Sequence, residues 1–152
     1  LPNYPSVLRS IDHIETKEVD LKECVQMFRQ NRYIFKDKDS YLKQLRKDAQ
    51  TKRCETDATN LDFQRNSYIG VLIRSGYCRY PKGLKYRLVK NNSKKQYVLN
   101  ISYIDPEGQV CRALSRYELW LQTPKLIEDF DVVYKVGSRP KNSRSIKSNS
   151  PL

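Results

Sequence analysis

The chain has 152 residues, of which 38% are hydrophobic and 30% are charged. This length is typical of one domain, and an aromatic content that includes 11 tyrosines excludes a wholly disordered chain. No apolar run approaches the roughly 18–20 residues that a membrane-spanning helix needs. A single histidine, five glycines without a phosphate-binding pattern and no recognisable catalytic signature indicate a protein that is not an enzyme and has no cofactor.

The charge balance is strongly basic. Lys and Arg number 29 against 17 Asp and Glu, which gives a net charge of +12. Such a chain is attracted to polyanions such as nucleic acid, anionic polysaccharide or an acidic membrane surface. The Ser-, Asn- and Pro-rich residues 137–152 contain basic residues and no acidic one. We therefore expect a disordered basic tail over 137–152 and one folded domain over 1–136.

The first 60 residues are predicted to be mainly helical, after a lead-in over residues 1–15. The first helix is expected over 20–30, where apolar residues recur at helical spacing: Leu21, Cys24, Val25 and Phe28. A short strand over 31–35 precedes a second helix, which runs to residue 50 and takes Asp37 or Asp39 as its N-cap.

From residue 61 onward the pattern is that of an antiparallel β region. Alternating or β-branched runs predict six strands, over 67–74, 83–90, 95–104, 109–114, 117–121 and 130–136. Asn91 to Lys94 are expected to form the second turn, because Asn tolerates a positive φ. Short strands joined by tight turns indicate an antiparallel sandwich or a strongly curved sheet. With two helices segregated before the strands, the predicted fold class is α+β.

Four cysteines, at positions 24, 54, 78 and 111, indicate two disulfides and an oxidising compartment. None belongs to a C-x-x-C pair and no histidine lies near any of them, so the usual zinc spacings are absent. There are two alternatives. The four single cysteines could together form a zinc site, or they could be reduced thiols in a cytosolic protein. Of the three possible pairings we favour Cys78–Cys111, between neighbouring strands, and Cys24–Cys54, between the two predicted helices.

Residues 61–136 resemble a family of uncharacterised exported domains from Bacteroides-type bacteria. The matching positions are Asp62, Phe63, Gly70, Ser75, Gly76, Cys78, Cys111, Trp120, Pro124, Lys125 and Leu126. The chain departs from the family pattern at Tyr77, where the family has a second Gly, and at Ile127, where it has a second Pro. The resemblance implies export to the periplasm or outer surface, often as a lipoprotein, and a disulfide between the two matching cysteines. It transfers no catalytic residue and no ligand.

The densest group of basic residues is the predicted hairpin over 82–95. Its candidate polyanion- or partner-binding residues are Lys82, Lys85, Arg87, Lys90, Lys94 and Lys95, with Tyr80 beside them. The alternative is a solvated face whose turn lysines protect a sheet edge. His13 lies beside Asp12 and Glu15 but has no accompanying nucleophile or second histidine, so we expect an incidental surface residue. Trp120 is expected in the core, with sugar stacking as the alternative, and no catalytic or metal site is predicted.

These features favour a non-catalytic exported binding module of the cell envelope or extracellular space. It would contact an anionic glycan or an envelope partner protein through the basic hairpin. We therefore expect the protein to be extracellular or periplasmic, and a full-length form to be anchored to the outer membrane. The alternative is a small basic nucleic-acid-binding protein or a ribonuclease-type toxin. A protease inhibitor that presents the loop over 76–81 is a further variant of the binding-module hypothesis.

Overall fold

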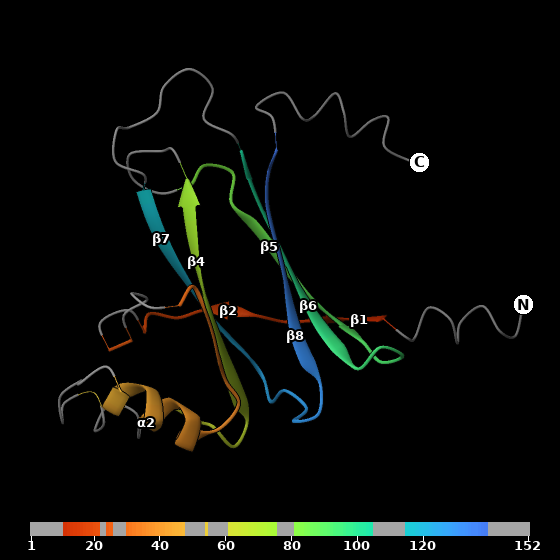
Figure 1. Ribbon diagram of the computed structural model, residues 1–152. Helices are drawn as coiled ribbons and strands as arrows, with labels where there is room; N and C mark the ends of the chain where they lie inside the picture. The colour runs from red at the N-terminus through yellow and green to blue at the C-terminus, as the bar shows by residue number, and fades with distance from the viewer. Residues whose placement is uncertain are drawn as a thin grey trace, which may run out of the picture.

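A computed structural model describes residues 11–21, 24–25, 30–47, 54, 61–75, 81–104 and 115–139. These residues form eight strands in two sheets and one helix of ten residues (Figure 1). The elements, in chain order, are β1 (Ile11–Ile14), β2 (Lys17–Glu18), β3 (Arg32–Phe35), α2 (Lys38–Lys47), β4 (Asn66–Ser75), β5 (Lys85–Asn91), β6 (Gln96–Ile104), β7 (Ser115–Pro124) and β8 (Asp131–Arg139).

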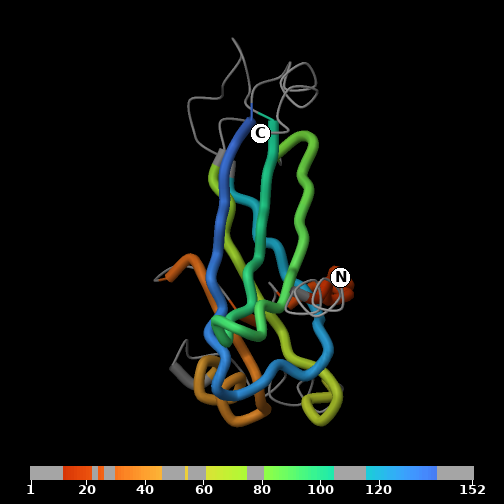
Figure 2. Tube along the Cα trace, turned by 90° about the vertical axis from the view of Figure 1, so that its right-hand side faces the viewer, coloured from red at the N-terminus to blue at the C-terminus, as the bar shows by residue number. Residues whose placement is uncertain are grey.

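The two sheets have four strands each. We call the sheet with strand order β1-β5-β6-β8 the outer sheet, and the sheet with order β2-β7-β4-β3 the inner sheet. Figure 2 looks onto the outer sheet, with β5, β6 and β8 side by side in front of β4 and β7. All strand pairs are antiparallel except β6 and β8, which are parallel because β7, which lies between them in sequence, belongs to the other sheet. The prediction of a purely antiparallel region is therefore wrong at this pair.

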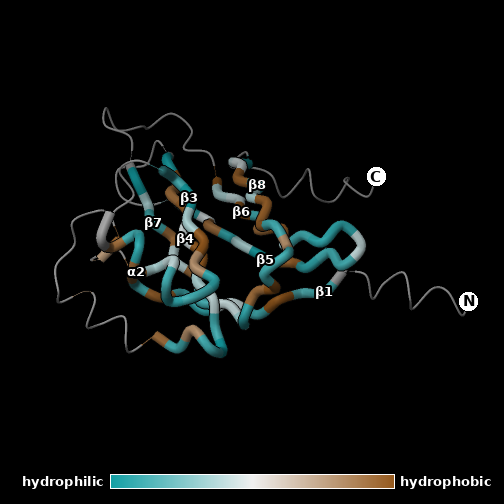
Figure 3. The backbone as a smooth tube through the Cα atoms, turned by 60° about the horizontal axis from the view of Figure 1, so that its bottom comes forward, coloured by the Kyte–Doolittle hydropathy of each residue, from teal (hydrophilic) through white to brown (hydrophobic). Residues whose placement is uncertain are grey.

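The two sheets pack face to face over one hydrophobic core. Alternate residues of β5 and β6 point into it, so these strands change between hydrophobic and hydrophilic along their length (Figure 3). Tyr97, Leu99 and Ile101, from the strand predicted over 95–104, are buried here. The buried residues of this core are Ile69, Val71, Ile73, Leu88, Tyr97, Leu99, Ile101, Leu119, Leu121 and Leu126.

The opposite face of the inner sheet is covered by a second core. Helix α2 contributes Tyr41 and Leu45, and β7 contributes Trp120, whose ring stacks on Phe35 at 6.0 Å between centroids with the planes 7° apart. The other buried members are Leu21, Val25, Tyr33, Cys54, Phe63, Tyr68 and Leu72. The inner sheet is therefore buried on both faces, whereas the described residues cover only one face of the outer sheet.

The predicted α+β class with two N-terminal helices is wrong, because the described structure is mostly β with one short helix. The second predicted helix corresponds to α2, and Asp37 is its N-cap, since the Ser40 N–H donates to Asp37 Oδ1 at 2.8 Å. In the first predicted helix, the described residues form a turn in which the Val25 N–H donates to the Leu21 carbonyl at 2.9 Å. Leu21 and Val25 are both buried in the second core, so their helical spacing reflects a buried turn.

One of the two favoured disulfides is confirmed. Cys24 and Cys54 are bonded, with their Cα atoms 5.6 Å apart, and Cys54 is buried in the second core. The bond ties the turn that follows β2 to a residue beyond α2, instead of joining two helices. The pair Cys78–Cys111 lies outside the described residues and stays a prediction.

Three further differences concern strand ends. β1 lies within the expected lead-in, and β2 lies between that lead-in and the helix predicted over 20–30. β8 extends to Arg139, so Gly137 to Arg139 belong to the sheet and not to the predicted tail. In the β5–β6 turn the positive φ falls on Lys95, at 52°, and not on an asparagine. The predicted strand over 109–114 and residues 140–152 of the predicted tail lie outside the described residues.

Candidate polyanion interface

The structure divides the predicted basic hairpin into two regions. Lys85 and Arg87 are exposed on β5 and alternate with Tyr86 and Leu88, which point into the sandwich core. They therefore lie on the solvent face of the outer sheet. The backbone of Lys82 leads into this strand, where its carbonyl accepts from the Ile104 N–H at 2.9 Å.

The other predicted cations lie elsewhere. Lys90 is half-buried on the core side of β5, and its Nζ lies 5.6 Å from the centre of the Phe130 ring. Lys94 and Lys95 lie in the turn at the far end of β5, roughly 20 Å from Lys85. That turn contacts acidic residues, since the Asn92 amide donates to Asp12 Oδ2 and the Asp131 N–H donates to the Lys95 carbonyl. Tyr80 lies outside the described residues.

Two cations from β8 join Lys85 and Arg87. In the register of the outer sheet, Arg87, Asn100 and Lys135 form one cross-strand row. Lys85, Ser102 and Gly137 form the next row, and Arg139 follows one step further along β8. Adjacent strands lie about 4.8 Å apart, so four cations surround a narrow polar strip. We call this surface the basic face; its residues are Lys85, Arg87, Asn100, Ser102, Lys135, Gly137 and Arg139.

Sequence reasoning missed Lys135 and treated Arg139 as part of the tail. The two residues reach the basic face only because β6 and β8 pair in parallel across a large sequence separation. No alternation in the sequence reveals them, because Val132, Val133 and Tyr134 form a continuous apolar run before Lys135.

The cations of the basic face have no ion-pair partner in the part of the chain that the structure describes. Lys85, Arg87 and Lys135 are exposed and Arg139 is half-exposed. Over β5, β6 and β8, the acidic residue on the same side is Asp131. It lies roughly 13 Å along β8 from Lys135, which exceeds the screening length of physiological salt. No described residue therefore compensates the charge of the face at close range.

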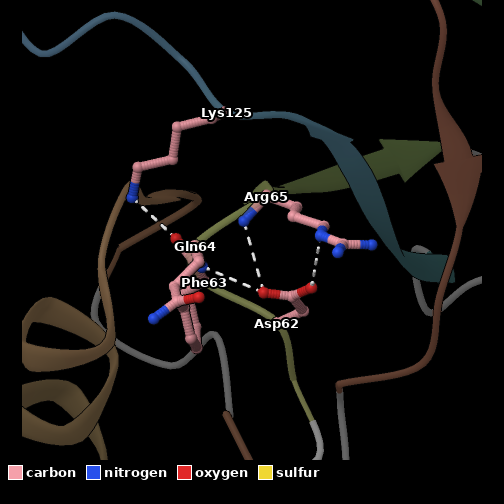
Figure 4. Close-up of polar contacts among 5 residues, drawn as sticks. All are labelled: Asp62, Phe63, Gln64, Arg65 and Lys125. Carbon is pink, nitrogen blue, oxygen red and sulfur yellow. Dashed lines mark hydrogen bonds and ion pairs between the residues drawn. The ribbon is translucent and has the colours of Figure 1, made fainter.

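Two other lysines, Lys36 and Lys125, donate hydrogen bonds to backbone carbonyls, unlike the lysines of the basic face. Lys125 Nζ donates to the Phe63 carbonyl at 2.8 Å (Figure 4). It also donates to the Lys36 carbonyl. In the same turn Asp62 accepts from the Gln64 N–H at 3.1 Å (Figure 4). Lys36 Nζ in turn donates to the carbonyl of Phe130 at 2.7 Å. These lysines satisfy backbone carbonyls between loops, whereas Lys85, Arg87 and Lys135 have no such contact among the described residues.

Arg139 is held in a defined position on the basic face. Its Nη1 donates to Ser102 Oγ at 3.1 Å and its Nη2 donates to the Gly83 carbonyl at 3.0 Å. Gly83 has a φ of +60°, and a Cβ there would lie 2.6 Å from Ile104. The turn therefore requires glycine, and its backbone carbonyl fixes the guanidinium across the end of the sheet.

Aromatic side chains are absent from the described solvent face of β5, β6 and β8, because their tyrosines point inward. The Tyr103 hydroxyl donates to the Arg74 carbonyl at 3.2 Å, and the Tyr134 hydroxyl donates to the Tyr33 carbonyl at 3.2 Å. Burial raises the pKa of Tyr134 above its ordinary range. These phenols therefore belong to the sandwich core.

The remaining predicted sites are structural or isolated. Trp120 is 2% exposed, which confirms its place in the core. His13 is exposed in β1 opposite Val89. Among the described residues no three His, Cys, Asp or Glu side chains are grouped to hold a metal, and none of the helical segments there could cross a membrane.

A recess of about 320 Å³ lies at the end of β2. Its lining residues are Glu18, Val19, Asp20, Tyr117, Glu118, Leu119 and Trp120. Three carboxylates give it a charge opposite to that of the basic face, so it is unsuited to an anionic ligand. The chain was also compared with protein-family models, curated proteins and solved structures, and none of them matched.

Proposed function

We propose that this protein is a non-catalytic, exported binding module that engages an anionic glycan through the basic face. The observation that carries the proposal is the row-by-row placement of four cations on β5 and β8, without a carboxylate partner in the described structure. A rigid sheet presents them at fixed spacings, which reduces the entropy lost on binding. The basic chain outside the described residues adds long-range attraction.

The disulfide supports the exported location. Cys24 and Cys54 are bonded, and such bonds form and persist in oxidising compartments such as the periplasm or the extracellular space. A glycan or envelope component of that environment is a polyanion that the basic face would meet.

The chemistry of the face favours a glycan over nucleic acid. Proteins that bind single strands stack the bases on exposed aromatic side chains, and the described solvent face of the outer sheet offers none. The polar strip of Asn100 and Ser102 instead offers hydrogen-bonding groups between the cations. The competing hypothesis is a nucleic-acid-binding protein or a ribonuclease-type toxin, and the experiment below also tests it.

The test is retention on immobilised heparin as a function of salt. The face variant reverses Lys85, Arg87 and Lys135 to Glu, and the matched control reverses Lys38, Lys43 and Lys94, which are equally exposed but lie on α2 and in the turn. Both variants lower the net charge by the same amount and keep the rest of the chain. We expect the face variant to elute at much lower salt than the control, with a shallower salt dependence.

Equal shifts of the two variants would contradict the proposal, because retention would then report only net charge. The competing hypothesis predicts a different result. Under it, the unmodified protein would cleave RNA during incubation, or would bind RNA in preference to heparin at equal salt. Either result would identify RNA, and not a glycan, as the ligand.

A further inference from the structure

Gly137 is a glycine that neither the backbone nor the packing requires. It lies within β8 and its φ is not in the left-handed region, in contrast to Gly83. A Cβ built at Gly137 meets no atom within 4 Å. Glycine weakens a strand relative to alanine, and besides bulges and tight bends it marks places where a ligand approaches the backbone closely.

The missing side chain leaves a notch in the basic face. Lys135 and Arg139 flank it along β8, each two residues away on the same side of the strand. Ser102 is its direct neighbour on β6, and Lys85 lies one strand further. The surrounding groups are therefore three cations and one hydroxyl, with no carboxylate in the same two rows.

The donors around the notch are already arranged. Two hydrogen bonds fix the Arg139 guanidinium and use one hydrogen of each Nη. Its other N–H groups have no partner among the described residues and are available for a ligand. Ser102 Oγ accepts from Arg139, which leaves the O–H proton of Ser102 available for donation. Lys85 and Lys135 can reach the notch from two other sides.

We propose that the Gly137 notch seats one sulfate or phosphate monoester group of the ligand. This inference rests on the proposed function and deepens it by naming the chemical group that is recognised. A monoester carries three terminal oxygens, which match donors that arrive from three directions, whereas a carboxylate offers only two oxygens. Arg139 provides the planar fork, and Lys85 and Lys135 provide point charges.

The experiment measures the affinity of the intact protein for three probes by calorimetry. A heparin-derived tetrasaccharide supplies sulfate, inositol hexakisphosphate supplies phosphate monoesters, and a hyaluronan tetrasaccharide supplies carboxylates only. Gly137→Val fills the notch with a residue that favours strands and finds open space, so folding should be unaffected. We expect it to bind the heparin tetrasaccharide about tenfold more weakly than the unmodified protein.

Ser138→Val is the matched control. Ser138 is exposed on the same strand, but its Cα partner is the inward-pointing Tyr103, so its side chain lies on the opposite side from Gly137. It should leave every affinity unchanged. Arg139→Lys, which keeps the charge but loses the fork, should weaken binding of the sulfated probe as well.

The outcomes separate the two proposals. Heparin binding that survives Gly137→Val at full strength overturns the notch and leaves the basic face intact. Absence of binding to both the sulfated and the phosphorylated probe overturns the basic face itself. If hyaluronan binds as strongly as the heparin tetrasaccharide, and Gly137→Val weakens both equally, the notch does not select a sulfate or phosphate monoester over a carboxylate. A preference between heparin and inositol hexakisphosphate, with both weakened by Gly137→Val, supports the notch and identifies the source of the group.

Discussion

Gly70 and Trp120 are Cα partners on β4 and β7, and the indole occupies the space where a side chain at Gly70 would lie. A Cβ at Gly70 would come within 2.3 Å of the Trp120 ring. The absence of a side chain lets the indole lie across β4 and stack on Phe35. The φ of Gly70 is not in the left-handed region, so the backbone does not require glycine here. The second core requires it for packing.

We expect Gly70→Ala to lower the free energy of unfolding by about 2–4 kcal/mol, because the large fixed ring of Trp120 cannot move without disturbing Phe35 and Tyr33. Urea unfolding followed by tryptophan fluorescence measures this change. Gly137→Ala is the matched control, since it adds the same methyl group in open space on another strand and should leave stability unchanged or raise it by up to about 1 kcal/mol. Similar losses for both variants would show that strand glycines, and not the contact with Trp120, explain the effect.

At the residue scale, the sequence predicted that Trp120 is buried but not which residue accommodates it. A tryptophan in an alternating strand is expected in a core, but its contact with Gly70 depends on the pairing of β4 with β7. These strands are separated by two others in the chain, and no local pattern indicates which strands of a sandwich pair.

Helix α2 shows how a single cap defines an element. Asp37 Oδ1 accepts from the Ser40 N–H, and this bond is the largest cause of a lowered pKa at Asp37. The Ser40 hydroxyl also donates to the Asp37 carbonyl at 2.9 Å. The cap satisfies one backbone donor that the first turn of a helix otherwise leaves without a partner.

We expect Asp37→Ala to lower the free energy of unfolding by about 1 kcal/mol at neutral pH. Because the pKa of Asp37 is lower in the folded than in the unfolded chain, the charged form stabilises the fold above an unfolded pKa of about 3.9, and that contribution is lost as pH falls through the folded value. The difference between the two proteins should therefore shrink in acid, as measured by urea unfolding at several pH values. Asp39→Ala, in the first turn of the same helix, should have a smaller effect. If Asp39→Ala lowers the free energy of unfolding more than Asp37→Ala does, Asp39 and not Asp37 is the N-cap that stabilises the helix.

At the element scale, prediction succeeded where one local signal was sufficient. The capped helix and the strands with regular alternation were located to within a few residues. The predicted helix over 20–30 failed because Leu21 and Val25, four residues apart, are buried by a turn that a disulfide ties to residue 54. The two short strands β1 and β2 were missed because two to four residues carry too little periodicity to be recognised.

The whole molecule is asymmetric in what covers its two sheets. The inner sheet is buried between two cores, and β4 accordingly has an uninterrupted buried run from Ser67 to Ile73. The outer sheet has one face turned to solvent, and its strands alternate. This difference is visible in the sequence, and the density of basic residues indicated the hairpin that contains Lys85 and Arg87. The basic face as a whole was not predictable, since half of its cations come from β8 and the parallel pairing with β6 has no local signal.

A protein with a net charge of +12 can attract a polyanion to many parts of its surface, so the place where the ligand binds distinguishes the basic face from net charge alone. Backbone amide shifts in a ¹⁵N–¹H NMR titration with a heparin-derived tetrasaccharide, at constant physiological salt, locate it directly. We expect the largest shifts on the basic face, at residues 85–87, 100–102 and 135–139, with residues 92–95 and α2 unaffected. Shifts concentrated in the β5–β6 turn, on α2 or only within residues 140–152 would show that the ligand does not bind at the basic face.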